Sequence, residues 1–407
     1  MPRIDQLSFG YVNCESLGNE VRWGAHRFRH AALLVKVRSE DGTVGLGLAW
    51  AHLDDEVSFA RAAQSALAAT IVGSDALSPY DTGKNAQNAA YNAGVSRAGS
   101  VVEMALWDLT GHLLDVPAYQ LLGCKKRSLP AYVISAEEFA FTSTSQFVAL
   151  ARRYVDSGFR ACKFHLWGEA ERDIAACRAI RKEVGDTVQL MLDPASRYGR
   201  ADALRVGRVI EELGFVRYED PISPHDMAGY RWLAERVSVP LVANETLRWS
   251  VQDCKVAAQS GTVQGFRLEI GRAGITHGLA LGAVAEANDV ELDVASLAPR
   301  GGIEVCLHFG LASSATRWFE HHEALGIEEI PGIASGVTIV DGVARPNEEA
   351  GFGCAVDWKE LNRHCTWIDC EPVAARLVTE KNWRPETPVE QVSMPTEFAT
   401  HEALGLE

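Results

Sequence analysis

The chain has 407 residues, of which 47% are hydrophobic and 23% are charged, and its formal net charge is −15. This composition suits a globular protein with a large core in one or two domains, and the negative charge argues against a nucleic-acid-binding surface. No apolar run reaches the roughly 18 residues of a membrane span, the first residues lack the apolar core of a signal peptide, and the nine cysteines form no CxxC pair. We therefore expect reduced thiols, a cytoplasmic location, and neither a membrane nor a nucleic acid as partner.

The first 125 residues have the pattern of an α+β segment. Residues 32–37 and 44–47 flank a tight turn at residues 40–43, which predicts a β-hairpin. Residues 57–71 and 101–109 have the apolar spacing of helices. Residues 18–24 form a polar loop with a tryptophan between glycines, which is typical of lids over active sites, although an ordinary surface loop fits equally well.

Regularly spaced strands follow from residue 131. Five short apolar runs each end on a charged residue, and after Lys163 these residues recur at gaps of 30, 26, 26 and 24 positions, at 193, 219, 245 and 269. Helix-like stretches lie between the runs, at 169–184, 201–213 and 226–237 among others, and one β/α unit takes about this many residues. The spacing predicts a closed barrel in which each charged residue stands at the C-terminal end of a strand.

Three of these strand-end residues are the carboxylates Asp193, Glu219 and Glu245. Carboxylates gathered at one barrel mouth repel one another unless a cation lies between them. An all-oxygen ligand set favours a hard divalent cation, Mg²⁺ first. Acidic residues also begin helices, where they cap free N–H groups, but three in register beside Lys163 and His165 favour the metal site.

The remaining elements complete the domain organisation. Residues 276–287 and 303–315 predict helices, residues 290–294 predict a seventh strand, and Glu320 follows close to the barrel mouth. From residue 357 the chain is polar and irregular, with four prolines between 372 and 395. We expect a cap at 1–125 completed by the C-terminal segment, a barrel at 126–356, and an extension at 357–407 that packs on the cap or at a subunit interface.

These motifs resemble the mandelate racemase and muconate lactonizing enzyme branch of the enolase superfamily, over residues 1 to about 356. ALWDL at 105–109, followed by LLG at 121–123, is similar to the segment that joins cap and barrel. Lys163-x-His165 stands at the family's second-strand Lys-x-Lys, and Asp193, Glu219 and Glu245 stand at its three magnesium ligands. The resemblance implies an α/β fold, a modified (β/α)7β TIM barrel with an α+β N-terminal capping domain, and Mg²⁺ as the cofactor.

Departures from the family pattern bear on the reaction. The second base position holds His165, and Glu269 stands at the end of the sixth strand, where the family carries Lys or Asp. Around residues 293–296 there is no histidine, so the His–Asp dyad of the racemases is missing. Glu320 resembles the glutamate that hydrogen-bonds the substrate carboxylate.

Other candidate residues concern substrate binding. By resemblance, the cap loops at 19–24 and 50–52 close over the substrate. Arg197 and Tyr198 follow Asp193 at the same mouth, and a simple helix-entry loop explains them equally well. The substrate-binding candidates are Asn19, Trp23, Trp50, His52, Arg197 and Tyr198.

The predicted chemistry is removal of the proton next to a carboxylate, with a metal stabilising the resulting enediolate. Strand alternation points Lys163 and His165 the same way, so Lys163 offsets the charge of the substrate carboxylate and His165 is the base. Salt-bridged or structural roles remain open for both. Glu269 is a general acid, an acceptor for sugar hydroxyls, or a partner of Lys163.

One base with one acid favours dehydration of a sugar acid to a 2-keto-3-deoxy acid. Racemisation, epimerisation or cycloisomerisation of a carboxylate is the alternative within enzymes, and a non-catalytic barrel that binds an acid and a metal is the alternative outside them. The expected partners are a small carboxylate substrate and further copies of the chain in a homo-oligomer.

Overall fold

The computed structural model describes residues 1–13, 21–23, 26–28, 30–52, 56–245, 249–296, 298–323 and 329–369. These residues belong to one compact unit, Met1–Cys370, while the second unit, Glu371–Glu407, lies outside the described residues. Within the described part of the chain, no helix combines the length and apolar character needed to cross a membrane.

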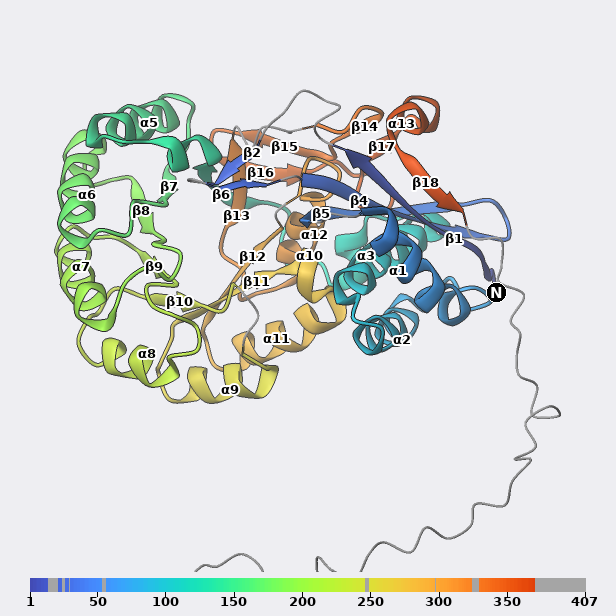
Figure 1. Cartoon of the computed structure of the whole chain (residues 1–407), viewed down its shortest axis with the longest axis horizontal. Coiled ribbons are helices and arrows are strands. Elements are labelled where there is room, and N and C mark those ends of the chain that lie inside the picture. Colours follow the sequence, from blue (N-terminus) through green and yellow to red (C-terminus); the bar gives the residue numbers. More distant parts are fainter. Residues whose placement is uncertain are drawn as a thin grey trace, which may run out of the picture. The chain divides into compact units, whose positions relative to one another are not determined.

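The N-terminal cap is an antiparallel sheet covered by helices (Figure 1). The sheet order is β18 (Thr366–Asp369), β1 (Ile4–Asn13), β4 (His30–Ser39) and β5 (Val44–His52). The turn between β4 and β5 is closed by the Ser39 N–H, which donates to the Thr43 carbonyl at 2.9 Å. This is the hairpin that the sequence predicts.

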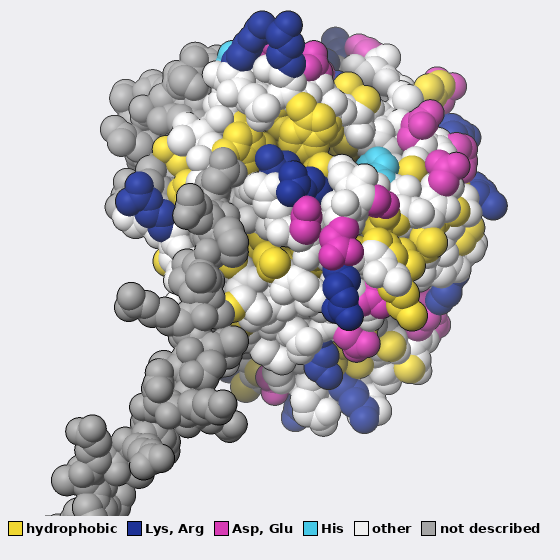
Figure 2. Space-filling view, turned by 90° about the vertical axis from the view of Figure 1, so that its right-hand side faces the viewer, with side chains coloured by type: hydrophobic (Ala, Val, Ile, Leu, Met, Phe, Trp, Pro, Cys, Tyr) yellow, Lys and Arg dark blue, Asp and Glu magenta, His cyan; other side chains and the backbone are white. Residues whose placement is uncertain are grey.

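Four helices follow the sheet: α1 (Glu56–Ile71), α2 (Pro79–Asn92), α3 (Ser96–Leu114) and α4 (Ala118–Leu122). Buried apolar side chains of α3 and β4 belong to the same hydrophobic cluster. A small strand pair, β2 (Val21–Trp23) and β3 (His26–Phe28), precedes β4. Figure 2 shows the cap-side face, where basic, acidic and apolar side chains are interspersed.

The barrel contains eight parallel strands along the described chain, and β13 closes it by pairing with β6. In order they are β6 (Leu129–Ser135), β7 (Ala161–Phe164), β8 (Gln189–Leu192), β9 (Arg217–Glu219), β10 (Leu241–Ala243), β11 (Gly265–Glu269), β12 (Glu291–Ala295) and β13 (Phe319–Glu323). The final strand has no barrel helix after it, so the architecture is (β/α)7β, as the resemblance implies.

Helices on the outside of the barrel follow the first seven strands (Figure 1). They are α5 (Thr144–Asp156), α6 (Ala170–Val184), α7 (Arg200–Glu212), α8 (Met227–Ala234), α9 (Val251–Gln259), α11 (Ile275–Ala287) and α12 (Glu304–Ala312), with the short η2 (Ala136–Ala140) after β6 and α10 (Ile270–Ala273) after β11. The helices predicted at 169–184, 201–213 and 276–287 agree with α6, α7 and α11 to within one residue.

The end of the described chain returns to the cap. The short strands β14 (Ile333–Ala334), β15 (Val337–Val340), β16 (Val343–Pro346) and β17 (Ala355–Val356) lead to α13 (Trp358–His364) and then to β18. β18 pairs antiparallel with β1. The Lys36 ammonium lies 5.8 Å from the ring centroid of Trp358 and 4.7 Å from that of Trp367. Residues 357–369 are therefore part of the cap.

Candidate active site

The charged residues that end the apolar runs all lie at the C-terminal ends of barrel strands. Lys163 is the last residue but one of β7, and His165 directly follows that strand. Asp193 directly follows β8. Glu219 is the last residue of β9, and Glu245 comes two residues after β10. Parallel strands bring these ends to one mouth. The first four side chains are buried, and the side chain of Glu245 is 26% exposed.

Lys163 is held among three carboxylates. Its Nζ lies 2.9 and 3.1 Å from the two oxygens of Glu219, 2.9 Å from Glu320 Oε2 and 3.8 Å from Asp193 Oδ2. Burial disfavours the charged ammonium, but these carboxylates outweigh burial and raise the pKa of Lys163 above its usual range. Lys163 is therefore a cation with ion-pair partners already in place.

His165 lies between two carboxylates. Its Nε2 is 3.1 Å from Asp193 Oδ2, and its Nδ1 is 2.5 Å from Glu138 Oε1. Burial lowers the pKa of the imidazole, but the charges of Asp193 and Glu138 raise it overall to about 10. The sequence predicts a ring that is neutral near pH 7. Two facing carboxylates favour the protonated ring, whereas a cation that binds Asp193 would offset one of them and favour the neutral ring that a base requires.

Two buried arginines extend the ionic cluster into the barrel. Arg217 and Arg267 each stand two residues before an acid that ends a strand, and strand alternation turns both into the interior. Arg267 Nη2 lies 2.6 and 2.7 Å from the oxygens of Glu320, and its Nε lies 3.3 Å from Glu219 Oε1. Both arginines also pair with Asp293 on β12.

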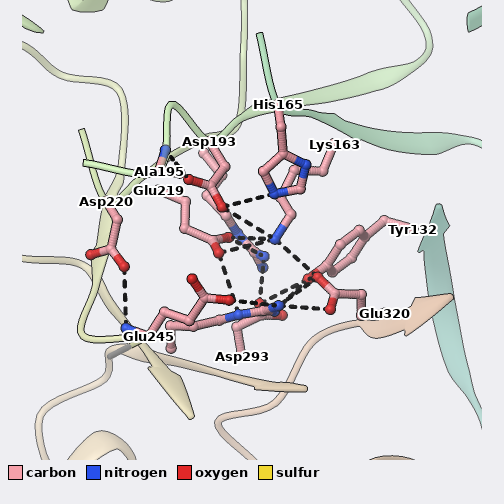
Figure 3. Close-up of polar contacts among 12 residues, drawn as sticks. Tyr132, Lys163, His165, Asp193, Ala195, Glu219, Asp220, Glu245, Asp293 and Glu320 are labelled. Carbon is pink, nitrogen blue, oxygen red and sulfur yellow. Dashed lines mark hydrogen bonds and ion pairs between the residues drawn. The ribbon is translucent and has the colours of Figure 1, made fainter. Parts of the chain in front are cut away.

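Tyr132 on β6 closes this cluster on the side of the first barrel strand. Its hydroxyl lies 2.5 Å from Glu320 Oε2 and 2.9 Å from Asp293 Oδ2, and Arg267 Nη1 donates to it at 2.8 Å (Figure 3). Glu320 also pairs with His322 Nε2 at 2.6 Å. Lys163 and Arg267 therefore both contact Glu320.

Burial raises the pKa of Glu219 despite its cationic neighbours. Burial raises the pKa of its carboxyl, Arg267 and Lys163 lower it, and Asp193 and Asp293 raise it again, to about 8 overall. A further positive charge in this part of the mouth would therefore stabilise the ionised carboxylate.

A strained loop carries Glu245. The preceding residue, Asn244, has φ of 87°, in the left-handed region that non-glycine residues rarely adopt. Its backbone N–H donates to Asp220 Oδ1 at 3.1 Å, and the Glu245 N–H donates to Asp220 Oδ2 at 3.2 Å. Tyr230 donates its hydroxyl to Asp220 at 3.0 Å. The buried Asp220 carboxyl therefore holds the backbone that presents Glu245, and burial raises its pKa to about 7.

Glu269, at the end of β11, is paired with Arg272 on the short helix α10 that follows. Its Oε2 lies 3.1 Å from Arg272 Nε, and its charge raises the pKa of Arg97, which burial lowers overall. The ion pairs of Lys163 instead go to Asp193, Glu219 and Glu320.

Arg197 and Tyr198 hold loops together. The Tyr198 hydroxyl donates to Asp173 Oδ2 at 2.5 Å, and Arg197 Nη1 donates to the Leu166 carbonyl at 2.7 Å. These contacts tie the loop before α7 to α6 and to the β7–α6 connection, respectively. The predicted contact Asn19 lies outside the described residues. Trp23, Trp50 and His52 belong to described strands, but their side chains lie outside the description.

Two family models match the chain. The model described as "Enolase C-terminal domain-like" matches residues 146–360, and the model described as "Mandelate racemase / muconate lactonizing enzyme, N-terminal domain" matches residues 25–123. The chain belongs to the mandelate racemase/muconate lactonizing enzyme family of the enolase superfamily. The match confirms the resemblance seen in the sequence and the capped-barrel fold that it implies.

Relatives in this family include enzymes of two reaction classes. L-talarate/galactarate dehydratase of Salmonella typhimurium is 26% identical over 352 residues, which cover 84% of this chain and 84% of that protein. L-Lys-D/L-Arg epimerase of Methylococcus capsulatus is 26% identical over 331 residues, 79% of this chain and 90% of that protein. Family membership therefore places the chain among enzymes and leaves lyase and isomerase reactions both open.

A solved structure in the same family contains a metal. The crystal structure of an L-talarate/galactarate dehydratase variant liganded with Mg and L-glucarate matches this fold with a TM-score of 0.76 at 21% identity, over 91% of this chain and 94% of that one. In the present chain, Asp193, Glu219 and Glu245 offer carboxylate oxygens one after another along adjacent strand ends (Figure 3). Their all-oxygen donor chemistry fits Mg²⁺.

The same carboxylates already have protein partners. Among the described residues, no three His, Cys, Asp or Glu side chains are arranged as a ready metal site. Lys163 and Arg267 contact the oxygens of Glu219, and His165 contacts Asp193. The negative charges of the mouth are thus partly balanced by the chain's own cations. The repulsion between Asp193, Glu219 and Glu245 therefore requires a metal less strongly than the sequence alone predicts.

Several site residues escape the family motifs. They are Tyr132, Glu138, Arg217, Asp220, Arg267 and Asp293. The pattern Arg-x-Glu occurs at 217–219 and again at 267–269. Because residues two apart on a strand share a face, this pattern predicts that each arginine points to the same side as the acid that follows it. Glu138 gives no such signal, because its partner His165 lies 27 positions later.

Proposed function

We propose that this enzyme removes the proton α to the carboxylate of a small hydroxylated acid in a Mg²⁺-dependent reaction. We propose further that it eliminates the β-hydroxyl, which makes it a dehydratase converting a sugar acid to a 2-keto-3-deoxy acid. The observation that carries the proposal is the placement of Lys163 and His165 side by side at the mouth, next to Asp193 and Glu219.

Asp193, Glu219 and Glu245 are the residues that would hold the metal. Bound there, Mg²⁺ supplies positive charge to the oxygens of a carboxylate that becomes an enediolate. Lys163 supplies a second positive charge in the same region, because its ammonium is ionised and lies within 4 Å of two of these carboxylates.

His165 is the residue that moves the proton. Its Nδ1 is engaged by Glu138, so Nε2 is the nitrogen that faces the mouth. In the first step the α C–H bond breaks, the proton goes to Nε2, and the electron pair enters the enediolate. In the second step that electron pair forms the C–C double bond and expels the β-hydroxyl, which takes a proton from Nε2 and leaves as water. The enol that remains tautomerises to the 2-keto acid.

The opposite side of the mouth supports elimination over racemisation. Racemisation requires a second base across the substrate carbon. Glu269 is paired with Arg272, and Ser296 follows the end of β12 where the racemases carry a histidine. A single residue that both accepts and returns a proton on one face suffices for elimination of water. Because the relatives also include epimerases, an isomerase reaction is the alternative to dehydration.

The test is proton NMR in D₂O with Mg²⁺ against sugar acids, 2-hydroxy acids and N-substituted amino acids. We expect one sugar acid to lose its α-proton signal and to gain a 3-deoxy methylene signal, and we expect EDTA to stop the change. Deuterium incorporation without the methylene would replace dehydration by racemisation or epimerisation. Mg²⁺ binding with no exchange on any acid would identify a non-catalytic binding protein.

The matched variant is His165→Asn. We expect at least about 100-fold slower α-proton exchange, because general acid–base catalysis contributes this much or more, with Mg²⁺ binding by calorimetry unchanged. His364→Asn, at an exposed position on α13, is the control for loss of a histidine. Exchange at the wild-type rate in His165→Asn would refute the assignment of the base.

A further inference from the structure

Glu138 is a buried carboxylate outside the motifs that the sequence presents. It lies in η2, the 3-10 turn directly after β6, and is 2% exposed. Burying a carboxylate costs free energy unless hydrogen bonds or charges compensate it, and burial raises the pKa of this group. A carboxylate at such a position therefore requires a hydrogen-bond donor or a positive charge beside it.

The partner of Glu138 is a single residue, His165, which directly follows the neighbouring strand β7. Glu138 Oε1 accepts from the His165 backbone N–H at 3.1 Å and lies 2.5 Å from His165 Nδ1. Its other oxygen, Oε2, is buried with no hydrogen-bond partner among the described residues. The start of η2 is capped by Ser135, so Glu138 does not serve as the cap. Its hydrogen bonds in the described structure therefore all come from His165.

The face of the His165 ring is also in contact with an aromatic ring. The ring of Phe139, the next residue of η2, lies 5.1 Å away between centroids at an interplanar angle of 37°. Two adjacent residues of η2 thus restrain one imidazole, one through its edge and one through its face. A histidine with an N–H held by a carboxylate keeps a defined tautomer and a defined ring orientation.

We propose that Glu138 is the positioning residue of His165. It fixes the proton on Nδ1 and directs Nε2 toward the barrel mouth, where Nε2 faces Asp193. The inference rests on the proposed function for its catalytic consequence. The hydrogen bond itself is a property of the resting protein, so it is tested separately.

The first readout uses the full-length resting protein labelled with ¹⁵N-histidine. A ring N–H proton held by a buried carboxylate gives a low-field NMR resonance, which is assigned to His165 by its absence in His165→Asn. We expect Glu138→Gln to shift or remove this resonance. Glu137→Gln is the matched control, because Glu137 is the preceding residue but pairs with Arg153 at the surface. The control is expected to keep the resonance.

The second readout is kinetic, on the acid that undergoes α-proton exchange. Loss of a group that orients a catalytic side chain reduces activity about 10- to 100-fold, and we expect Glu138→Gln to lower kcat by this factor with KM within about threefold. Glu138→Asp keeps the charge and withdraws the carboxylate by one methylene. It provides an intermediate case and substitutes for Glu138→Gln if that variant does not fold.

The outcomes separate the two proposals. An unaltered resonance in folded Glu138→Gln or Glu138→Asp overturns the positioning role, whatever the substrate panel shows. Equal losses of kcat in the Glu137 and Glu138 variants overturn it as well. A resonance that depends on Glu138, in a protein that exchanges no α-proton, supports the pairing and rejects the proposed reaction.

Discussion

Buried histidines in this molecule respond to their surroundings in opposite directions. His165 faces two carboxylates, and these raise its pKa. His308 on α12 is fully buried and accepts the Tyr119 backbone N–H at Nδ1, at 3.2 Å. Burial lowers the pKa of His308 to about 4, although the charge of Asp108 opposes this. Two carboxylates in direct contact therefore raise the pKa of one imidazole, whereas burial dominates and lowers the pKa of the other.

His308 makes folding stability depend on pH. In the unfolded chain a histidine takes up a proton below about pH 6.5, whereas folded His308 does so only near pH 4. The unfolded state therefore binds more protons between these values, and stability falls as the pH drops through that range. We expect the His308 contribution to cost about 2 kcal/mol between pH 7 and pH 5.

Urea unfolding of the wild type and of His308→Asn at pH 7 and pH 5 checks this prediction. The asparagine oxygen can still accept the Tyr119 N–H, and the variant is expected to lose less stability between the two pH values than the wild type. The exposed His364→Asn variant is the control for removing a histidine. Equal pH sensitivity of wild type and His308→Asn would contradict the prediction.

At the scale of elements, the cap depends on a very close approach between a hairpin strand and a helix. Gly45 and Gly47 alternate with leucines along β5, so both point to the same face. A Cβ on Gly47 would lie 2.1 Å from the Val101 carbonyl oxygen, and one on Gly45 would lie 2.2 Å from that of Ala105. The backbone of α3 therefore lies directly on β5, and only glycine fits between them.

Gly47→Ala should force β5 and α3 apart. Because the obstructing atoms belong to a helix backbone, they cannot rotate away, and overpacking of this kind costs about 1–3 kcal/mol or more. The control is Gly282→Ala on α11, where a Cβ would meet only Leu292 at an ordinary 3.7 Å. We expect the control to be neutral or slightly stabilising, since alanine favours helix. Thermal unfolding of both variants measures the difference, and equal midpoints would contradict the close-packing argument.

At the scale of the whole molecule, the chain closes on itself. Residues far apart in sequence meet where β18 lies beside β1, with Tyr11 opposite Thr366 and Ser8 opposite Asp369. Leu361 on α13 is fully buried in the large cluster that also contains the barrel core. The last described residues therefore contribute to the cap sheet and to the core at the same time.

Truncation tests this closure. A chain ending at Val356 lacks α13 and β18, and it should lose about 3 kcal/mol or more, since full burial of a single leucine already contributes about 1.5–3 kcal/mol. A chain ending at Asp369 keeps both elements and should unfold close to the full-length midpoint. Differential scanning calorimetry of the three chains measures this. A chain ending at Val356 that is as stable as the full-length protein would show that α13 and β18 contribute nothing to the fold.

The spacing of strand-end charges determined the barrel, the register of its units and the meeting of Lys163, His165, Asp193 and Glu219 at one mouth. These follow from the sequence because strand alternation and the length of a β/α unit are local properties. The family models then confirmed the capped-barrel fold.

Only the tertiary structure decided which charges pair. Arg267 on β11 reaches Glu219 on β9 and Glu320 on β13, and His165 meets Glu138 from the preceding barrel unit. These choices depend on through-space distances between strands and on burial, which strengthen some ion pairs and shift pKa values. The sequence alone does not show which side chains on different strands lie closest. The partners of His165 and of Glu269 were therefore known only from the tertiary structure.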